Sequence, residues 1–232
     1  FLHNLSEPNF QYAVRMTVAL AAIAVPLNTI FGLCTAWALA NKHFRGRTLL
    51  LSIIDLPFAI SPVVAGLMIM LLYGRQGWFG AWLIEHNIKI VFAFPAMMLA
   101  TAFVSMPFVA REVIPVLEEE GTSQEEAAYT LGATPWQTFW RVTAPNIRWG
   151  LLYGVLLTNA RAMGEFGAVS VVSGNIMGQT QSLPLFVEEA YKSYNTEAAY
   201  AASVLLALLA VVTLVLKEIL ERRTGRGAKK IH

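Results

Sequence analysis

Apolar residues along this chain gather into five long runs, and a polar patch separates each run from the next. The runs are Gln11–Ala40, Leu49–Tyr73, Val91–Leu117, Trp149–Ser173 and Ala198–Leu220, and each holds at least 23 residues. A helix of about 20 apolar residues is long enough to cross a bilayer. Only 14% of the residues are charged, whereas soluble domains carry about a quarter. We therefore predict an all-α polytopic membrane protein with five spans.

The basic residues between the runs indicate how the spans are oriented. Twelve lie on one set of loops and at the C-terminus: Lys42, Arg45, Arg47, Arg111, Arg141, Arg148, Lys217, Arg222, Arg223, Arg226, Lys229 and Lys230. The alternate loops hold three: Arg75, Lys89 and Lys192. Because basic loops stay in the cytoplasm, we expect the loop after the third run and the C-terminus to be cytoplasmic.

These counts divide the chain into an extracytoplasmic segment (residues 1–10), a membrane domain (11–220) and a basic cytoplasmic tail (221–232). The chain begins at Phe1 with polar residues on the outer side. We therefore expect an N-terminal span that precedes this sequence.

The longest polar interruption, residues 118–148, carries the signals of a short helix in its first half. Ser123 and Glu126 have the spacing of a capping box, so a helix should begin near Gln124. Gly132 supplies the left-handed residue that ends a helix after Leu131.

The second half of this loop repeats the start signal. Thr134 and Gln137 form a second capping box, Pro135 occupies the first helical position, and Pro145 limits this helix. A loop that holds two short, well-capped helices is typical of a docking surface.

Asp55 is an ionisable residue within the second run, where Pro57 and Pro62 bracket a stretch that cannot be regular helix throughout. Broken helices at membrane depth occur where protein or a watery cavity satisfies the backbone. Asp55 is thus a candidate for lining a pathway or a hinge. Equally, it could lie near the cytoplasmic interface and cap a helix.

The fourth run begins with Gly150 and Gly154, a GxxxG spacing that allows close helix approach, and continues to Asn159, Arg161 and Glu165. Arg161 and Glu165 are four residues apart, the spacing of an ion pair on one helix face. One interpretation is an internal pair that ties this helix to a neighbour, with Asp55 joining. The other places Asn159, Arg161 and Glu165 on a translocation path for an anion. We favour the internal pair, because a nearby carboxylate already neutralises the arginine.

Several chemistries are missing from the sequence. It contains no phosphate-binding G-x-x-x-x-G-K-[ST] loop, no H-E-x-x-H and no G-x-S-x-G, and its four histidines lie outside the runs. Cys34 is the only cysteine, which excludes an intrachain disulfide. We therefore expect no enzymatic activity, no metal and no cofactor. The basic tail points to membrane lipid rather than nucleic acid.

The loop resembles the EAA motif of type I ABC importer permeases, which reads E-A-A, three residues, G, nine residues, I-x-L-P. The matching residues are Glu126, Ala127, Ala128, Gly132, Val142 and Pro145. Val142 stands for Ile, and Ala144 departs from the Leu of the motif. In that family the loop forms coupling helices that dock on a separate ATPase subunit, so the resemblance implies an energy source that this sequence lacks.

Longer stretches, among them DLPFAISPVVAGLM and NARAMGEFGAVSVVSG, resemble the W-type permease subunit of sulfate/thiosulfate importers. The resemblance implies a multi-pass subunit of the bacterial inner membrane with a type I permease domain at 11–220. It further implies a second homologous permease, two ABC ATPase subunits and an extracytoplasmic sulfate-binding protein. The alternatives are a molybdate/tungstate permease and an ATP-independent secondary anion carrier.

Overall fold

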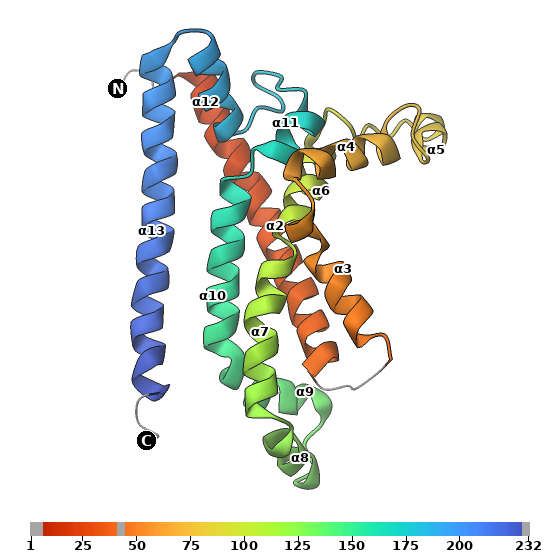
Figure 1. Cartoon of the computed structure of the whole chain (residues 1–232), viewed down its shortest axis with the longest axis vertical. Helices are drawn as coiled ribbons and strands as arrows, with labels where there is room; N and C mark the ends of the chain where they lie inside the picture. Colours follow the sequence, from red (N-terminus) through yellow and green to blue (C-terminus); the bar gives the residue numbers. More distant parts are fainter. Residues whose placement is uncertain (1–6, 41–44, 229–232) are drawn as a thin grey trace.

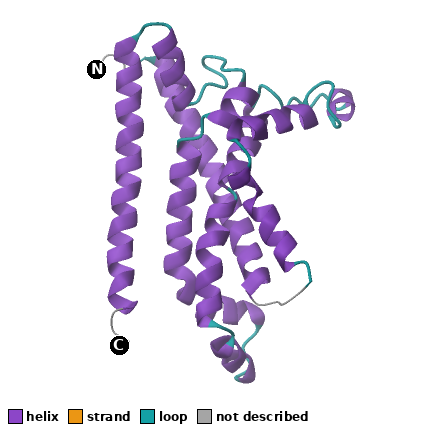
Figure 2. Ribbon diagram, in the orientation of Figure 1, coloured by secondary structure: helices purple, strands orange, loops and turns teal. Residues whose placement is uncertain are grey.

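The structure is a computed structural model that describes residues 7–40 and 45–228. Within these ranges the regular elements are all helices (Figure 2). In chain order they are α2 (Pro8–Ala40), α3 (Arg47–Ala59), α4 (Pro62–Tyr73), α5 (Gly80–Glu85), α6 (Phe94–Ser105), α7 (Pro107–Glu120), α8 (Ser123–Thr130), α9 (Pro135–Thr138), the π-helix η1 (Phe139–Thr143), α10 (Ala144–Met163), α11 (Gly167–Ser173), α12 (Leu183–Lys192) and α13 (Thr196–Ala228). Residues 1–6 of the expected outer segment and 229–232 of the expected tail lie outside the described residues.

The long helices α2, α7, α10 and α13 run along the long axis of the molecule, and α2, α7 and α10 pack against one another (Figure 1). The short helices α8 and α9 lie at one end, where α13 also ends (Figure 1). At the other end lie α11 and α12, and α4 and α5 project sideways from the bundle near that end (Figure 1). The fold thus places residues 118–148 and the C-terminal helix end on the same side.

The prediction of five spans is not confirmed. By length and composition, three helical stretches of the described chain can cross a membrane: Pro8–Ala40, Phe94–Glu120 and Thr196–Thr213. The second run is a fourth candidate only as a bent pair, because α3 and α4 meet at 108°. The break at Ile60 and Ser61 lies before Pro62, as the sequence predicted. The fourth run divides between α10 and α11, and its polar residues reduce its hydropathy.

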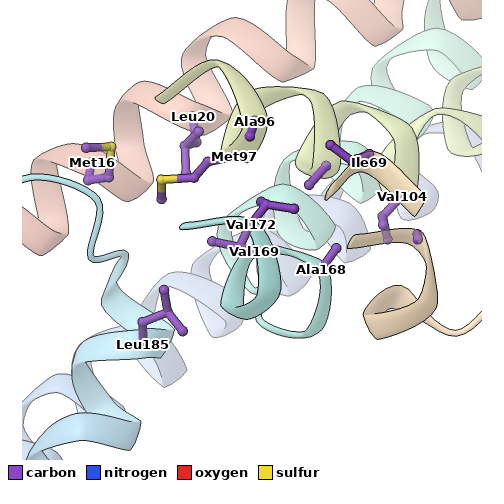
Figure 3. Packing of buried hydrophobic residues seen from close by; sticks show 12 residues of the cluster. Met16, Leu20, Ile69, Ala96, Met97, Val104, Ala168, Val169, Val172 and Leu185 are labelled. Atoms are coloured by element: carbon purple, nitrogen blue, oxygen red, sulfur yellow. The ribbon is translucent and has the colours of Figure 1, made fainter. Parts of the chain in front are cut away.

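Two of the three buried apolar clusters in the described chain join α2 to the helices packed around it, and the third joins α2 and α12 to α13. One joins α2, α4, α6, α11 and α12 through residues that include Leu20, Ile69, Met97, Val169 and Leu185 (Figure 3). The other joins α2, α3, α7 and α10 and lies nearer the 118–148 loop. Because lipid tails are as apolar as these side chains, close van der Waals packing rather than removal of apolar area from water holds such helices together within a bilayer.

The GxxxG spacing in α10 marks a close contact with α7, as predicted. A Cβ atom added at Gly154 would lie 2.9 Å from Val109 Cα, and one added at Gly150 would lie 2.9 Å from Val116 Cγ2. The obstacle at Gly154 is backbone, which cannot rotate away.

We expect Gly154→Ala to lower the thermal stability of the detergent-solubilised protein, because the methyl group must push α7 away. Overpacking of this kind costs about 1–3 kcal/mol. Gly164→Ala is a matched control, since its Cβ would meet Ala160 O at an ordinary 3.5 Å. The comparison uses the temperature at which each variant loses its monodisperse size-exclusion peak, and equal temperatures would contradict the close contact.

Candidate functional site

The first helix of the loop, α8, begins one residue earlier than the capping box predicted. Thr122 occupies the N-cap position, and Ser123 is the first helical residue. The Ser123–Glu126 box is therefore not formed. Instead the Thr122 hydroxyl donates to Glu126 Oε1 at 2.8 Å. Glu125 and Glu126 lie in the first turn, where carboxylates interact favourably with the helix dipole.

The turn after α8 is the one predicted at Gly132. Its φ of 84° lies in the left-handed region. The Gly132 N–H donates to Tyr129 O at 2.9 Å, and the Ala133 N–H donates to Ala128 O at 3.0 Å. This pair of bonds is a Schellman motif, which satisfies two carbonyls at the helix end. A Cβ at Gly132 would meet nothing within 4 Å, so the backbone conformation alone requires glycine.

The second helix starts as predicted but does not stop at Pro145. Thr134 and Gln137 form both bonds of the capping box, and Pro135 lies in the first turn of α9. The chain then passes through η1 directly into α10, whose first turn contains Pro145. Because proline lacks an N–H, it is tolerated at a helix start, and the wider turn of η1 precedes it. The loop is thus continuous with the helix of the fourth run.

Two side-chain contacts join α8 to the end of η1 and the first turn of α10. The Thr143 hydroxyl donates to Glu125, and Asn146 Nδ2 donates to Gln124 Oε1 at 3.0 Å. None of the eight residues of α8 is buried. A braced helix that contributes nothing to the core has its surface free for another protein.

The EAA-motif residues lie on α8, in the turn that follows it, and where η1 passes into α10. Glu126, Ala127 and Pro145 are exposed, and Ala128 and Val142 are half-buried. The small Ala127 and Ala128 side chains leave the α8 backbone accessible to close approach.

An exposed aromatic cluster next to this surface was missed from the sequence. Trp136 and Trp140 are 70% and 56% exposed, and their rings are 5.6 Å apart. Phe139 lies 5.3 Å from Trp140. Leu131, at the tip of the turn, is 89% exposed. Three large aromatic residues within five positions of a polar loop could have indicated this surface from the sequence, because aromatic side chains are enriched at protein interfaces.

Of the two predicted roles, the structure contradicts the helix cap, while a place for Asp55 on a pathway or at a hinge stays a prediction. Asp55 lies within α3, and its carboxylate accepts hydrogen bonds from Nε and Nη2 of Arg111 on α7. The bond from Nε is 2.7 Å long. Asp55 therefore does not join Arg161 and Glu165, and it is not a helix cap. The two residues are 56 positions apart in the sequence, so no local pattern could predict this contact between α3 and α7.

The Arg161–Glu165 pair forms as predicted, although the two residues do not share one helix. Arg161 Nη1 lies 2.8 Å from Glu165 Oε2, but α10 ends at Met163. Glu165 is 3% exposed, and its Oε1 accepts the Ala168 N–H at 2.8 Å at the start of α11. The carboxylate therefore bridges the break between α10 and α11. Asn159 stays apart from the pair; its Nδ2 lies 3.8 Å from Met163 Sδ.

The fold defines the class of protein: it is the transmembrane fold of type I ABC importers. A chain in the crystal structure of a bacterial alginate ABC transporter, in complex with an alginate-bound periplasmic protein, superposes with a TM-score of 0.77. The match covers 97% of this chain and 82% of that one at 16% identity, so it speaks for the fold alone.

The chain belongs to the family of binding-protein-dependent transport system inner membrane components, whose model matches residues 28–226. It is 68% identical to the sulfate transport system permease protein CysW of Synechocystis, over 97% of this chain and 82% of the relative. It is 41% identical to the sulfate transport system permease protein CysT of Escherichia coli, over 96% of this chain and 80% of that protein. This chain is therefore a membrane component of an ABC transporter.

Proposed function

We propose that this chain is a permease subunit of an ATP-driven importer that carries sulfate, and also thiosulfate, into the cytoplasm. The observation that carries this proposal is the 68% identity to a sulfate permease over 97% of the chain. Identity of this extent includes the membrane helices as well as the loop. An importer of this class moves its substrate by rocking helices between inward- and outward-open states.

The proposed partners are a second homologous permease, two ABC ATPase subunits and an extracytoplasmic sulfate-binding protein. The 41% identity to a second type of sulfate permease supports a paired permease. The family description, which refers to a binding protein, supports the extracytoplasmic partner. ATP hydrolysis is assigned to the separate ATPase subunits, so this chain is not itself the enzyme.

The loop at residues 118–148 is the proposed docking site for an ATPase subunit, through Glu126, Ala127, Ala128, Gly132, Val142 and Pro145. Its braced, unburied α8 and its exposed tryptophans support this assignment. The loop lies at the same end of the molecule as the end of α13 (Figure 1). We assign both to the cytoplasmic side, in agreement with the basic residues of the tail.

The proposal predicts which loaded binding protein activates the complex. The chain is purified with its natural partners and reconstituted in liposomes, and ATP hydrolysis and radiolabelled sulfate uptake are measured. We expect sulfate-loaded binding protein to stimulate hydrolysis and ATP-dependent uptake, because transport needs both partners.

The same vesicles test the alternatives. Stimulation by a molybdate- or tungstate-loaded binding protein, with none by sulfate, would overturn the sulfate assignment. Sulfate uptake by the chain alone without ATP would indicate a secondary carrier instead.

A further inference from the structure

A row of three side-chain contacts joins α3 to α7. Arg47 pairs with Glu118, Asp55 pairs with Arg111, and the Phe58 ring meets Phe108 edge to face at 5.3 Å between centroids. The partners follow one another in opposite sequence order along α3 and α7. The two helices therefore form an antiparallel pair with one fixed register. We call these three contacts the α3–α7 ladder.

The ladder supplies much of what holds α3 in place. Of the thirteen residues of α3, only Ile54 and Pro57 are buried. The apolar Leu49 and Ile53 are 66% and 49% exposed. Apolar contacts alone would let one helix slide over another. The two-point Arg111–Asp55 contact opposes sliding, because a planar guanidinium fits a carboxylate in one geometry.

One end of the ladder adjoins the loop proposed to dock on the ATPase. α7 ends at Glu120, and only Gly121 and Thr122 separate it from α8. Glu118, in the last turn of α7, pairs with Arg47 at the first residue of α3, and Arg47 Nε also donates to Leu39 O of α2 at 3.1 Å. A displacement of the loop must therefore act on α3 as well as on α7.

The other end of α3 leads to a tight contact at the far side of the molecule. α3 turns by 108° into α4, which packs along α11. A Cβ added to Gly66 of α4 would lie 2.7 Å from Ala168 O, and one added to Gly167 would lie 3.0 Å from Pro62 Cβ. Ile69 of α4 lies in one cluster with Val169 and Val172 of α11 (Figure 3). Closely packed helices transmit displacement rather than absorbing it.

We propose that the α3–α7 ladder makes α3 a lever that carries movement of the 118–148 loop to the α4–α11 contact at the opposite end. This inference rests on the proposed function. Asp55 and Arg111 are its positioning residues, because their two-point ion pair sets the register of α3 against α7. Without the pair, the ATPase still moves α7, and the two remaining contacts of the ladder no longer hold α3 in a fixed register, so α3 slides instead of following the full movement.

The test is a charge swap in the complete reconstituted complex. Three variants are compared with the wild type: Asp55→Arg, Arg111→Asp, and the double variant that carries both. Two quantities are measured in the same vesicles, which are the ATP hydrolysis stimulated by loaded binding protein and the anion molecules taken up per ATP. Size-exclusion chromatography reports how much complex assembles.

We expect each single variant to keep at least half of the stimulated hydrolysis while uptake per ATP falls tenfold or more. We expect the double variant to recover uptake per ATP to within twofold of wild type, because the reversed pair restores the same contact. Lys192→Glu serves as a charge-reversal control. It breaks an exposed ion pair with Glu188 within α12, far from the ladder, and should leave uptake per ATP unchanged.

Three results would overturn the lever. Single variants with wild-type uptake per ATP would show that the pair transmits nothing. Variants that assemble poorly but transport normally per ATP would show a structural role only. A double variant that assembles yet stays uncoupled would show that pairing is not what matters. Because uptake per ATP is compared with the wild-type complex, failure of the lever is distinct from failure of the sulfate assignment, which the wild type alone decides.

Discussion

Replacing Gly132 with valine is expected to reduce ATP-driven uptake by about tenfold or more while the protein remains folded in the membrane. The φ of Gly132 is 84°, a conformation that costs an L-residue about 1–2 kcal/mol and a β-branched residue more. One to two kcal/mol changes a population about 5- to 30-fold. The turn that presents α9 beside α8 would thus be a minor state, and the ATPase would lose its docking surface.

The fold itself should survive this substitution, since a Cβ at Gly132 has open space within 4 Å. Gly132→Asn is the matched control, because asparagine tolerates the left-handed region while adding a larger side chain than alanine. We expect the Asn variant to retain most of the uptake. Membrane insertion, thermal stability and ATPase co-purification are measured for both. Full uptake by the Val variant would remove the loop from the coupling path.

The parts of the loop that the sequence predicted depend on neighbours in the chain. Gly132 and the Thr134–Gln137 box each need only three or four consecutive residues to be recognised, and both appear in the structure. The Ser123 box failed because the helix begins one residue earlier, with Thr122 at the N-cap position and its hydroxyl bonded to the Glu126 side chain. Pro145 was misread for a related reason, since proline can start a helix as well as stop one.

The ion pairs show which contacts can be predicted from nearby residues in the sequence and which cannot. Arg161 and Glu165 are four residues apart, so their contact could be predicted even though the helix breaks between them. Asp55 and Arg111 are 56 residues apart, and only the packing of α3 against α7 brings them together. Hydropathy located the second run and Pro62 indicated a break within it, but the 108° angle between α3 and α4 had no local signal in the sequence.

The Arg161–Glu165 pair is expected to act in assembly rather than in anion choice. Glu165 is 3% exposed and holds the start of α11 through Ala168, so its charge needs the arginine. Removing one partner of a buried pair costs about 3–5 kcal/mol, and the 31% exposure of the Arg161 side chain places this case at the lower end. We therefore expect Arg161→Ala to reduce the thermal stability and yield of the complex strongly.

Two matched variants separate this structural role from a place on the anion path. The double variant Arg161→Met with Glu165→Gln removes both charges, and Gln keeps a carbonyl oxygen for the Ala168 N–H, so stability should largely return. Asn159→Ala changes a neighbouring polar residue outside the pair and should shift stability by less than about 1 kcal/mol. The extracytoplasmic binding protein then decides which anion is transported. Each variant that assembles should therefore take up sulfate with the wild-type preference over molybdate. A charge that only joins α10 to α11 cannot distinguish one anion from another. A complex that assembles normally without Arg161 but changes its anion preference would therefore place this residue on the pathway.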